Sequence, residues 1–341
     1  MTSRQAAIYG VSGPELSSDE IDFISEVKPL GFIIFSRNIR SLEQVSNLVS
    51  HLKSFVKDDE TLVLIDQEGG RVARLRPPLI RGYPKAEIYG KIFELNPVNG
   101  MRAAYLGAVL MAKDLLSLGI NVDCTPCLDL SLPQTSDVIG DRSFSKHPEV
   151  VGALGQSVAQ GFLDEGALPV IKHIPGHGRS AVDSHKDLPR VAASDAELAS
   201  DLLPFHALSG ALMAMTAHVI FDAWDVDQCA TLSPFVINEV IRKKIGFDGL
   251  LMSDDLDMKA LSGEIGKLAL TSQRAGCDVV LNCWAKMTDM VSIAEKLSAP
   301  SLQAQDRMSC VCAALASATG SATIRERQAA LIERRDQLRS L

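Results

Sequence analysis

The stretch ALPVIKHIPGHGRSAVDSHKDLP, residues 167–189, begins as a short apolar run and ends as a loop rich in charged residues, glycine and proline. Three of the chain's seven histidines lie between Lys172 and Pro189. A strand followed by such a loop is typical of α/β enzymes, which gather their reactive groups at the carboxyl ends of parallel strands. The stretch therefore predicts a strand that ends near Ile171 and an active-site loop after it.

Similar apolar runs recur along the chain, and segments with helical periodicity separate them. The eight expected strands are 6–9, 31–35, 61–65, 120–124, 168–171, 212–216, 249–252 and 278–281. Capping patterns at Ser17, Ser41, Ser194 and Ser233 support the helices between them. The alternation predicts an α/β fold with one (β/α)8 TIM barrel domain over residues 1–341 and a solvated helical segment at about 301–341. Residues 77–99, rich in proline and glycine, are expected to form a long excursion before a helix.

Composition indicates a soluble globular protein, with 46% hydrophobic and 22% charged residues. No window approaches the roughly 18 apolar residues of a membrane span, and the first residues do not resemble a secretory signal, so we expect a cytoplasmic protein. The net charge of −8 argues against a nucleic-acid surface. Seven irregularly spaced cysteines indicate no disulfide framework, and Cys124 and Cys127 are expected to be core thiols.

Polar residues with no evident packing role follow the expected strands and do not precede them. A barrel requires this placement, because the carboxyl ends of its strands share one mouth. These residues are Asp66, Glu68, Arg71, Arg74, Asp129, Arg142, Lys172, His173, His218, Ser253, Asp254 and Asp255.

Three residues are the strongest candidates for catalysis. Asp254 at a strand end has the chemistry of a nucleophile, a general base or a metal ligand, and its position alone leaves these open. Its neighbour Asp255 is expected to be a helix cap or loop acceptor. Asp183 and His185 are two residues apart, so the carboxylate can orient the imidazole for proton transfer near neutral pH.

The remaining polar groups are candidates for substrate binding. Lys172 and His173 are expected to donate hydrogen bonds to substrate hydroxyls, and Asp66 to accept them. The arginines Arg71, Arg74 and Arg142 can pair with substrate or with protein carboxylates. His177, between two glycines, is expected to be structural, with its ring bonded to loop backbone.

In this order, DQEGGRV, GDRSF, KHIPGHG, DSHKDLP, TAHV and MSDDLDM resemble motifs of the β-N-acetylhexosaminidases of glycoside hydrolase family 3, most closely the bacterial single-domain NagZ type of cell-wall recycling. The resemblance implies a retaining exo-glycosidase that removes non-reducing terminal N-acetylglucosamine, with anhydro-muropeptides as substrates. It implies Asp254 as nucleophile and His185 with Asp183 as acid/base. It also implies a sugar pocket formed by Asp66, Arg74, Arg142, Lys172 and His173.

Retaining glycosidases usually hold two carboxyl groups about 5 Å apart, whereas the resemblance implies that a His-Asp pair replaces one of them here. The chain departs from the family pattern at Arg179, a bulky cation on the active-site loop that puts leaving-group preference in question.

Two other enzyme classes are alternatives to a β-N-acetylhexosaminidase. A metal-dependent amidohydrolase on the same barrel would use histidines and aspartates, but no HxH follows the first strand. Another family 3 β-glycosidase is the second alternative. We expect no cofactor and no metal, a small muropeptide or N-acetylglucosaminide as the binding partner, no nucleic-acid or membrane partner, and a monomer.

Overall fold

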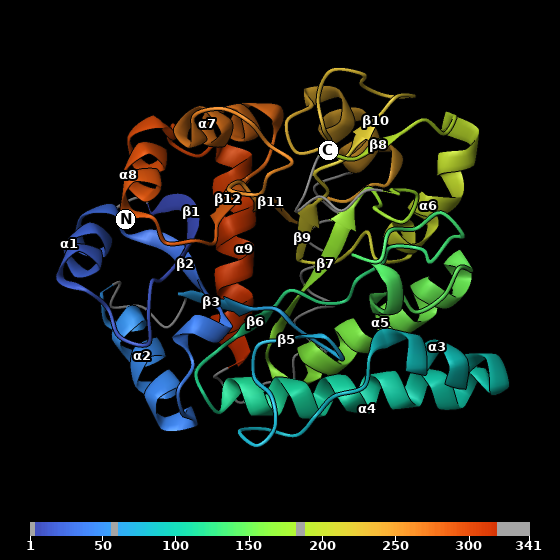
Figure 1. The fold of residues 1–341 in the computed structure, drawn as a ribbon, viewed down its shortest axis with the longest axis horizontal. Coiled ribbons are helices and arrows are strands. Elements are labelled where there is room, and N and C mark those ends of the chain that lie inside the picture. Colours follow the sequence, from blue (N-terminus) through green and yellow to red (C-terminus); the bar gives the residue numbers. More distant parts are fainter. Residues whose placement is uncertain (1–3, 56–60, 182–187, 319–341) are drawn as a thin grey trace.

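The computed structural model describes residues 4–55, 61–181 and 188–318. Its centre is a closed barrel of eight parallel strands, which confirms the fold predicted from the sequence (Figure 1). All eight expected strands are present. In chain order they are β1 (Gln5–Gly10), β2 (Pro29–Ile34), β3 (Leu62–Ile65), β6 (Val122–Asp123), β7 (Leu168–Ile174), β9 (Met213–Thr216), β11 (Leu250–Asp255) and β12 (Val279–Asn282).

Helices surround the barrel, and several begin at the caps expected from the sequence. Ser17 and Ser194 form complete capping boxes, and the Ser41 side chain accepts from the backbone of Gln44. The main helices are α1 (Ser18–Val27), α2 (Leu42–Ser54), α3 (Ala86–Leu95), α4 (Pro97–Leu116), α5 (Pro148–Glu165), α6 (Asp195–Ala207), η3 (Val236–Lys244, with π-type hydrogen bonding), α7 (Ile265–Ala275), α8 (Met287–Lys296) and α9 (Leu302–Ala318). None of the described helices is long and apolar enough to cross a membrane.

The excursion expected over residues 77–99 is partly wrong, because it contains helix α3 and the start of α4. The α3 sequence AEIYGKIFEL has apolar residues at helical spacing. Gly90 lies where α3 meets the Phe144 backbone so closely that a Cβ would clash. This glycine permits close packing here and does not end the helix.

Alternating residues of the strands contribute to two apolar clusters. On β1, Ala7 and Tyr9 face the surrounding helices, whereas Ala6 and Ile8 face the barrel interior. The thiol of Cys124 belongs to the interior cluster and Cys127 is also buried, which confirms both as core cysteines.

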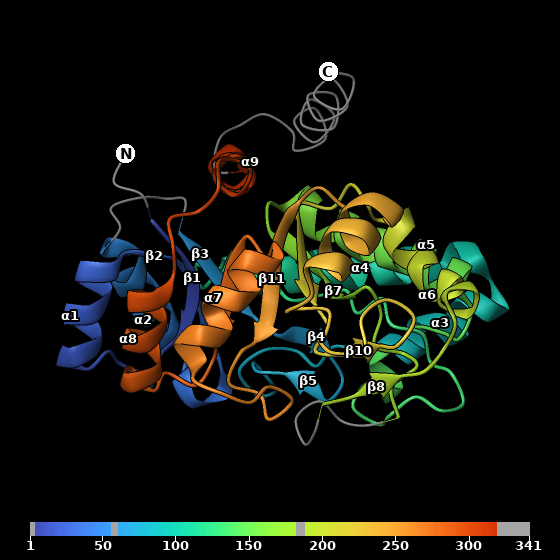
Figure 2. The same cartoon turned by 90° about the horizontal axis from the view of Figure 1, so that it is seen from above.

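Helix α9 closes one end of the barrel (Figure 2). Its Met308, Val311, Cys312 and Leu315 are buried in the same cluster as the interior residues of the strands. Arg307 pairs with Asp248 and Asp278, which lie within two residues before β11 and β12, so this is the amino-terminal end. The helix expected from residue 301 is present in the described part of this segment, but the expectation that it is solvated is wrong there, because one face packs against the barrel.

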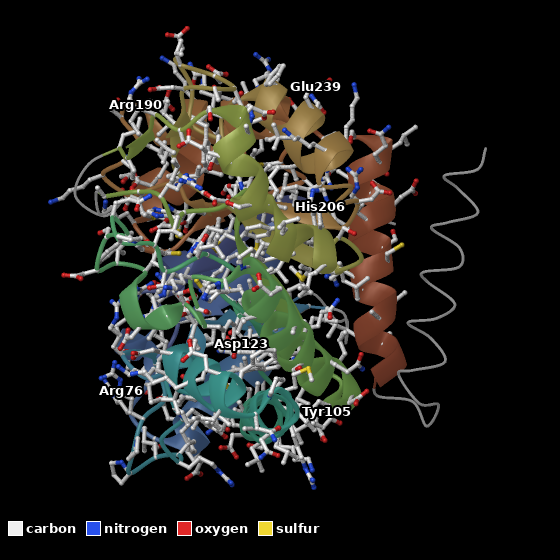
Figure 3. All side chains as sticks on the ribbon, turned by 90° about the vertical axis from the view of Figure 1, so that its right-hand side faces the viewer. Arg76, Tyr105, Asp123, Arg190, His206 and Glu239 are labelled. Atoms are coloured by element: carbon white, nitrogen blue, oxygen red, sulfur yellow. The ribbon has the colours of Figure 1, made fainter. Side chains whose placement is uncertain are left out.

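The opposite end carries short accessory strands and loops. Here β4 (Gln67–Gly69) pairs with β5 (Val72–Ala73), and β8 (Arg190–Val191) pairs with β10 (Ile220–Phe221). Arg76 and Arg190 lie on the side facing away from α9 (Figure 3). The carboxyl ends of the barrel strands thus open onto loops.

Candidate active site

A pocket of about 710 Å³ opens at the carboxyl ends of the strands. Among the described residues, the charged lining consists of Arg37, Arg71, Arg74, Arg142, Lys172, Lys259 and Lys286, with Asp66, Asp254, Asp255 and Asp257. Two further carboxylates pair with these cations, Glu68 with Arg142 and Lys172 and Asp141 with Arg71. Protein carboxylates therefore balance most of the positive charge around the pocket.

Lys172 lies at the centre of a buried ion network at the pocket floor. Strand β7 brings its Nζ to 2.9 Å from Asp66 Oδ1 and 2.7 Å from Glu68 Oε1. The Arg74 guanidinium holds the other oxygen of Asp66 at 2.8 Å. Burial alone would raise the pKa of Asp66, but the charges of Lys172 and Arg74 lower it well below its usual range.

Arg142 donates two hydrogen bonds to Glu68. Its Nε lies 2.9 Å from Glu68 Oε2 and its Nη2 lies 2.7 Å from Oε1. Burial acts to raise the pKa of Glu68, but Arg142 and Lys172 outweigh it and lower the value to about 2. Asp66, Arg74, Arg142 and Lys172, all predicted from the sequence to bind substrate, therefore meet at one place with a fixed pattern of charge.

His173 follows Lys172 in β7 and points into the same pocket. Its Nδ1 lies 2.6 Å from Asp129 Oδ2, a pairing that holds the ring and places a proton on Nδ1. Its Nε2 then faces the pocket, 3.5 Å from Arg142 Nη2. Cys127 Sγ also donates to this carboxylate oxygen of Asp129 at 3.2 Å. The atoms of Cys127, Asp129 and His173 lie close enough to hold a metal ion, but these protein hydrogen bonds already account for their arrangement.

The prediction for His177 is wrong in its detail. The residue is buried and lines the pocket, but neither ring nitrogen has a hydrogen-bond partner among the described residues. Its anchor is instead its own backbone N–H, which donates to Asp129 Oδ1 at 2.6 Å. Burial lowers the pKa of the ring to about 4, so the imidazole is neutral at pH 7.

Asp254 is the next-to-last residue of β11 and lines the pocket, at the strand end that the sequence predicted. The backbone N–H of Asp255 donates to Asp254 Oδ1 at 2.8 Å. No hydrogen bond reaches Asp254 Oδ2 from the part of the chain that the structure describes. Burial would raise the pKa of Asp254, but the nearby His218 and His173 rings lower it below its ordinary value. The group is an ionised carboxylate with one oxygen oriented by backbone.

Asp255 has the structural role expected of it, but it caps no helix, since α7 begins only at Ile265. Its Oδ1 accepts from the backbone N–H groups of Cys283 at 3.0 Å and Asp257 at 3.2 Å. These bonds join the ends of β11 and β12. Burial raises its pKa to about 6.

Both ring nitrogens of His218 are occupied by protein groups. Nε2 donates to the Asp255 carbonyl oxygen at 3.0 Å, and Nδ1 lies 2.7 Å from Thr231 Oγ1. A metal-dependent amidohydrolase would need histidine nitrogens that converge on one point. The hydrogen bonds of His218 and of His173 argue against that alternative.

Asp183 and His185, the predicted acid/base pair, lie outside the described residues. Hydrogen bonds fasten the chain on both sides of them. Before them, the Ser136 N–H donates to the Ser180 carbonyl at 2.8 Å; after them, the Ile220 N–H donates to the Pro189 carbonyl at 2.9 Å.

Arg179 points toward α6. Its Nε lies 2.7 Å from Asp201 Oδ2 on α6, and it does not line the pocket. Arg71 likewise pairs with a protein carboxylate, that of Asp141 at 2.8 Å, although it does line the pocket.

Sequence reasoning missed several residues of this site. Glu68 was noted at its strand end but given no role, and neither Arg37 nor Trp284 was singled out, although both line the pocket. Both follow barrel strands within three residues, so the rule used for the other strand ends could have found them.

Comparisons with known proteins agree with this geometry. Residues 10–313 match the glycosyl hydrolase family 3 N-terminal domain. Beta-hexosaminidases of Alkalilimnicola ehrlichii and Methylococcus capsulatus are each 38% identical over 281 residues, covering 81% of this chain and 80% and 82% of theirs.

Two solved structures have the same fold. NagZ from Neisseria gonorrhoeae has a TM-score of 0.83 at 29% identity, with 96% of each chain covered. A family 3 beta-N-acetylglucosaminidase from Paenibacillus has a TM-score of 0.84 at 30% identity; 94% of this chain covers 63% of that longer chain. The chain belongs to glycosyl hydrolase family 3 and is a glycoside hydrolase of the β-hexosaminidase type.

Proposed function

We propose that this enzyme is a retaining exo-β-N-acetylglucosaminidase that removes non-reducing terminal N-acetylglucosamine, with anhydro-muropeptides of peptidoglycan recycling as its natural substrates. The observation that carries the mechanism is Asp254, an oriented and ionised carboxylate in the pocket. The names of the curated relatives support the sugar specificity.

In the proposed mechanism Asp254 attacks the anomeric carbon through Oδ2. The glycosidic C–O bond breaks as the Asp254–sugar bond forms, and His185, oriented by Asp183, gives its proton to the leaving oxygen. The neutral imidazole then takes a proton from water, which displaces Asp254 and releases the sugar. Asp254 suits the first step because a nucleophile must be deprotonated, and its lowered pKa keeps it so.

The buried network supplies the sugar recognition in this proposal. Asp66 and Lys172 present an acceptor and a donor that are already held by Arg74 and Glu68, so binding a sugar hydroxyl requires little reordering. His173 presents Nε2, and Arg142 lies beside it.

The test is hydrolysis of 4-nitrophenyl N-acetyl-β-glucosaminide beside 4-nitrophenyl β-glucoside. Because the leaving groups are identical, the ratio of kcat/KM reports only the sugar. We expect the acetamido sugar to be preferred by at least about 100-fold, since a site built for a polar substituent discriminates strongly against its absence. Preferential cleavage of the glucoside would overturn the assignment in favour of another family 3 β-glycosidase.

A further inference from the structure

Trp284 is a large aromatic residue left exposed at the rim of the pocket. It is 59% exposed, follows the end of β12 directly after Cys283, and lines the pocket. Tryptophan is usually well buried on average, so an exposed one beside a binding pocket indicates a contact surface. The proposed mechanism gives this side chain no task.

The backbone around Trp284 is held in place. The Cys283 N–H donates to Asp255 Oδ1 at 3.0 Å, and the Cys283 carbonyl accepts from Arg37. On the other side, Ala285 has a φ of 55°, a left-handed conformation that is uncommon for alanine. Unfavourable backbone of this kind is found at ligand contacts that the surrounding structure enforces. Trp284 is therefore presented on a fixed support.

The position of Trp284 decides which part of the substrate it meets. The groups that recognise the transferred sugar are buried, as the side chain of Lys172 at 2% exposure shows. In an exo-acting enzyme the transferred sugar occupies the closed end of the pocket, and everything beyond the bond that breaks extends toward the opening. A side chain at the rim can then contact only the leaving group.

We propose that Trp284 is the platform on which the leaving-group sugar stacks, an inference that rests on the proposed function. A pyranose presents a face of C–H groups and a rim of hydroxyls. The indole face of Trp284 can pack on the C–H groups. The charged side chains in the same lining can hydrogen-bond the hydroxyls; they are Asp257, Lys259 and Lys286. The ion pair of Lys286 with Asp257 at 2.6 Å joins the two loops that carry these residues.

The test compares two substrates with the same transferred sugar. N,N′-diacetylchitobiose has a sugar as its leaving group, whereas methyl N-acetyl-β-glucosaminide has only methanol. Both leaving groups are alcohols that need a proton, so the chemistry is alike and the difference lies in contacts beyond the bond. Wild type, Trp284→Ala and Trp284→Phe are compared by kcat/KM on both.

Trp284→Ala should lower kcat/KM for the disaccharide by roughly three- to tenfold, mostly through KM, and change that for the methyl glycoside by less than about twofold. Trp284→Phe keeps an aromatic face and should recover most of the loss. The matched control is Trp224→Phe, which removes the chain's other tryptophan, a residue that stacks on Phe221 and does not line the pocket. Trp224→Phe should leave kcat/KM unchanged for both the disaccharide and the methyl glycoside.

A direct readout accompanies the kinetics. In the Trp224→Phe, Asp254→Asn double variant all tryptophan emission comes from Trp284, and adding the uncleaved disaccharide should change it while the methyl glycoside should not. Equal losses on both substrates in Trp284→Ala, or no loss on either, would overturn the platform. If wild type cleaves neither substrate, the proposed function itself fails and the platform fails with it.

Discussion

The two ends of the barrel are built from different kinds of side chain. At the carboxyl end, the buried ionised groups Asp66, Glu68, Arg142 and Lys172 hold one another in fixed positions. At the amino end, α9 covers the interior with apolar side chains. Buried charge is costly unless it is paired, whereas apolar burial is favourable by itself. The charged carboxyl end therefore holds polar groups in position for chemistry, whereas the apolar amino end seals the barrel interior.

The largest expected effect is that of Asp254→Asn at the charged end. Losing the proposed nucleophile should lower kcat on the aryl N-acetylglucosaminide by about 10⁴-fold. The melting temperature should not fall, since Asn retains Oδ1 to accept from the Asp255 N–H. Asp257→Asn is the control, because this carboxylate lines the same pocket and pairs with Lys286. It should retain activity within about tenfold, and an Asp254→Asn enzyme with more than about 1% activity would contradict the proposed nucleophile.

A second prediction tests whether the charged end also contributes stability. Glu68→Gln leaves Arg142 and Lys172 without one anionic partner and should lower the free energy of unfolding by about 3 kcal/mol at pH 7. The lowered pKa of Glu68, about 2 against an ordinary 4.5, sets the pH dependence. The contribution of ionised Glu68 to the free energy of unfolding is fully present above about pH 4.5 and is lost as the pH falls toward 2. The unfolding free energies of wild type and Glu68→Gln should therefore converge in that range.

The control for this prediction is Glu87→Gln. Glu87 also contacts two lysines, Lys85 at 2.7 Å and Lys91 at 2.5 Å, but it lies at the surface. Denaturant unfolding at several pH values should show a cost below about 1 kcal/mol for it. Equal costs for the two variants would mean that burial of the Glu68 network is energetically unimportant.

The smallest expected effect is at the apolar end. Leu315→Ala in α9 should cost about 2–3 kcal/mol of stability, because its buried side chain belongs to the interior cluster. Leu302→Ala on the same helix removes a side chain that is 78% exposed and should cost less than about 0.5 kcal/mol. Neither change should alter kcat/KM by more than about twofold below the melting temperature. A selective loss of activity in Leu315→Ala would show that the two ends are coupled.

The sequence predicted the barrel well because each strand carries its own local signal, and one rule about strand ends brought Asp66, Lys172 and Asp254 to a single mouth. The segment 86–95 was missed as a helix because its glycine was interpreted as a loop signal. Tertiary packing decides that case, since Gly90 is required where α3 approaches Phe144.

The pairings within the site were beyond sequence reasoning for a different reason. Glu68 and Arg142 are 74 residues apart, and nothing local to either indicates that they meet. The ring of His177 was expected to bond loop backbone, but among the described residues it has no hydrogen-bond partner, and Asp129 accepts from the backbone N–H of His177 instead. Such partners depend on how the loops fold over the barrel, which the pattern of apolar residues does not encode.

The hydrogen bonds on either side of residues 182–187 have a practical consequence for enzyme engineering. Upstream, Asp129 holds both the His173 ring and the His177 backbone; downstream, Ile220 holds Pro189. These hydrogen-bonded residues mark the two ends of a segment that can be replaced as a unit. In the mechanism proposed above, exchanging residues 182–187 for those of another family member should change proton delivery and leave the buried ion network around Lys172 in place.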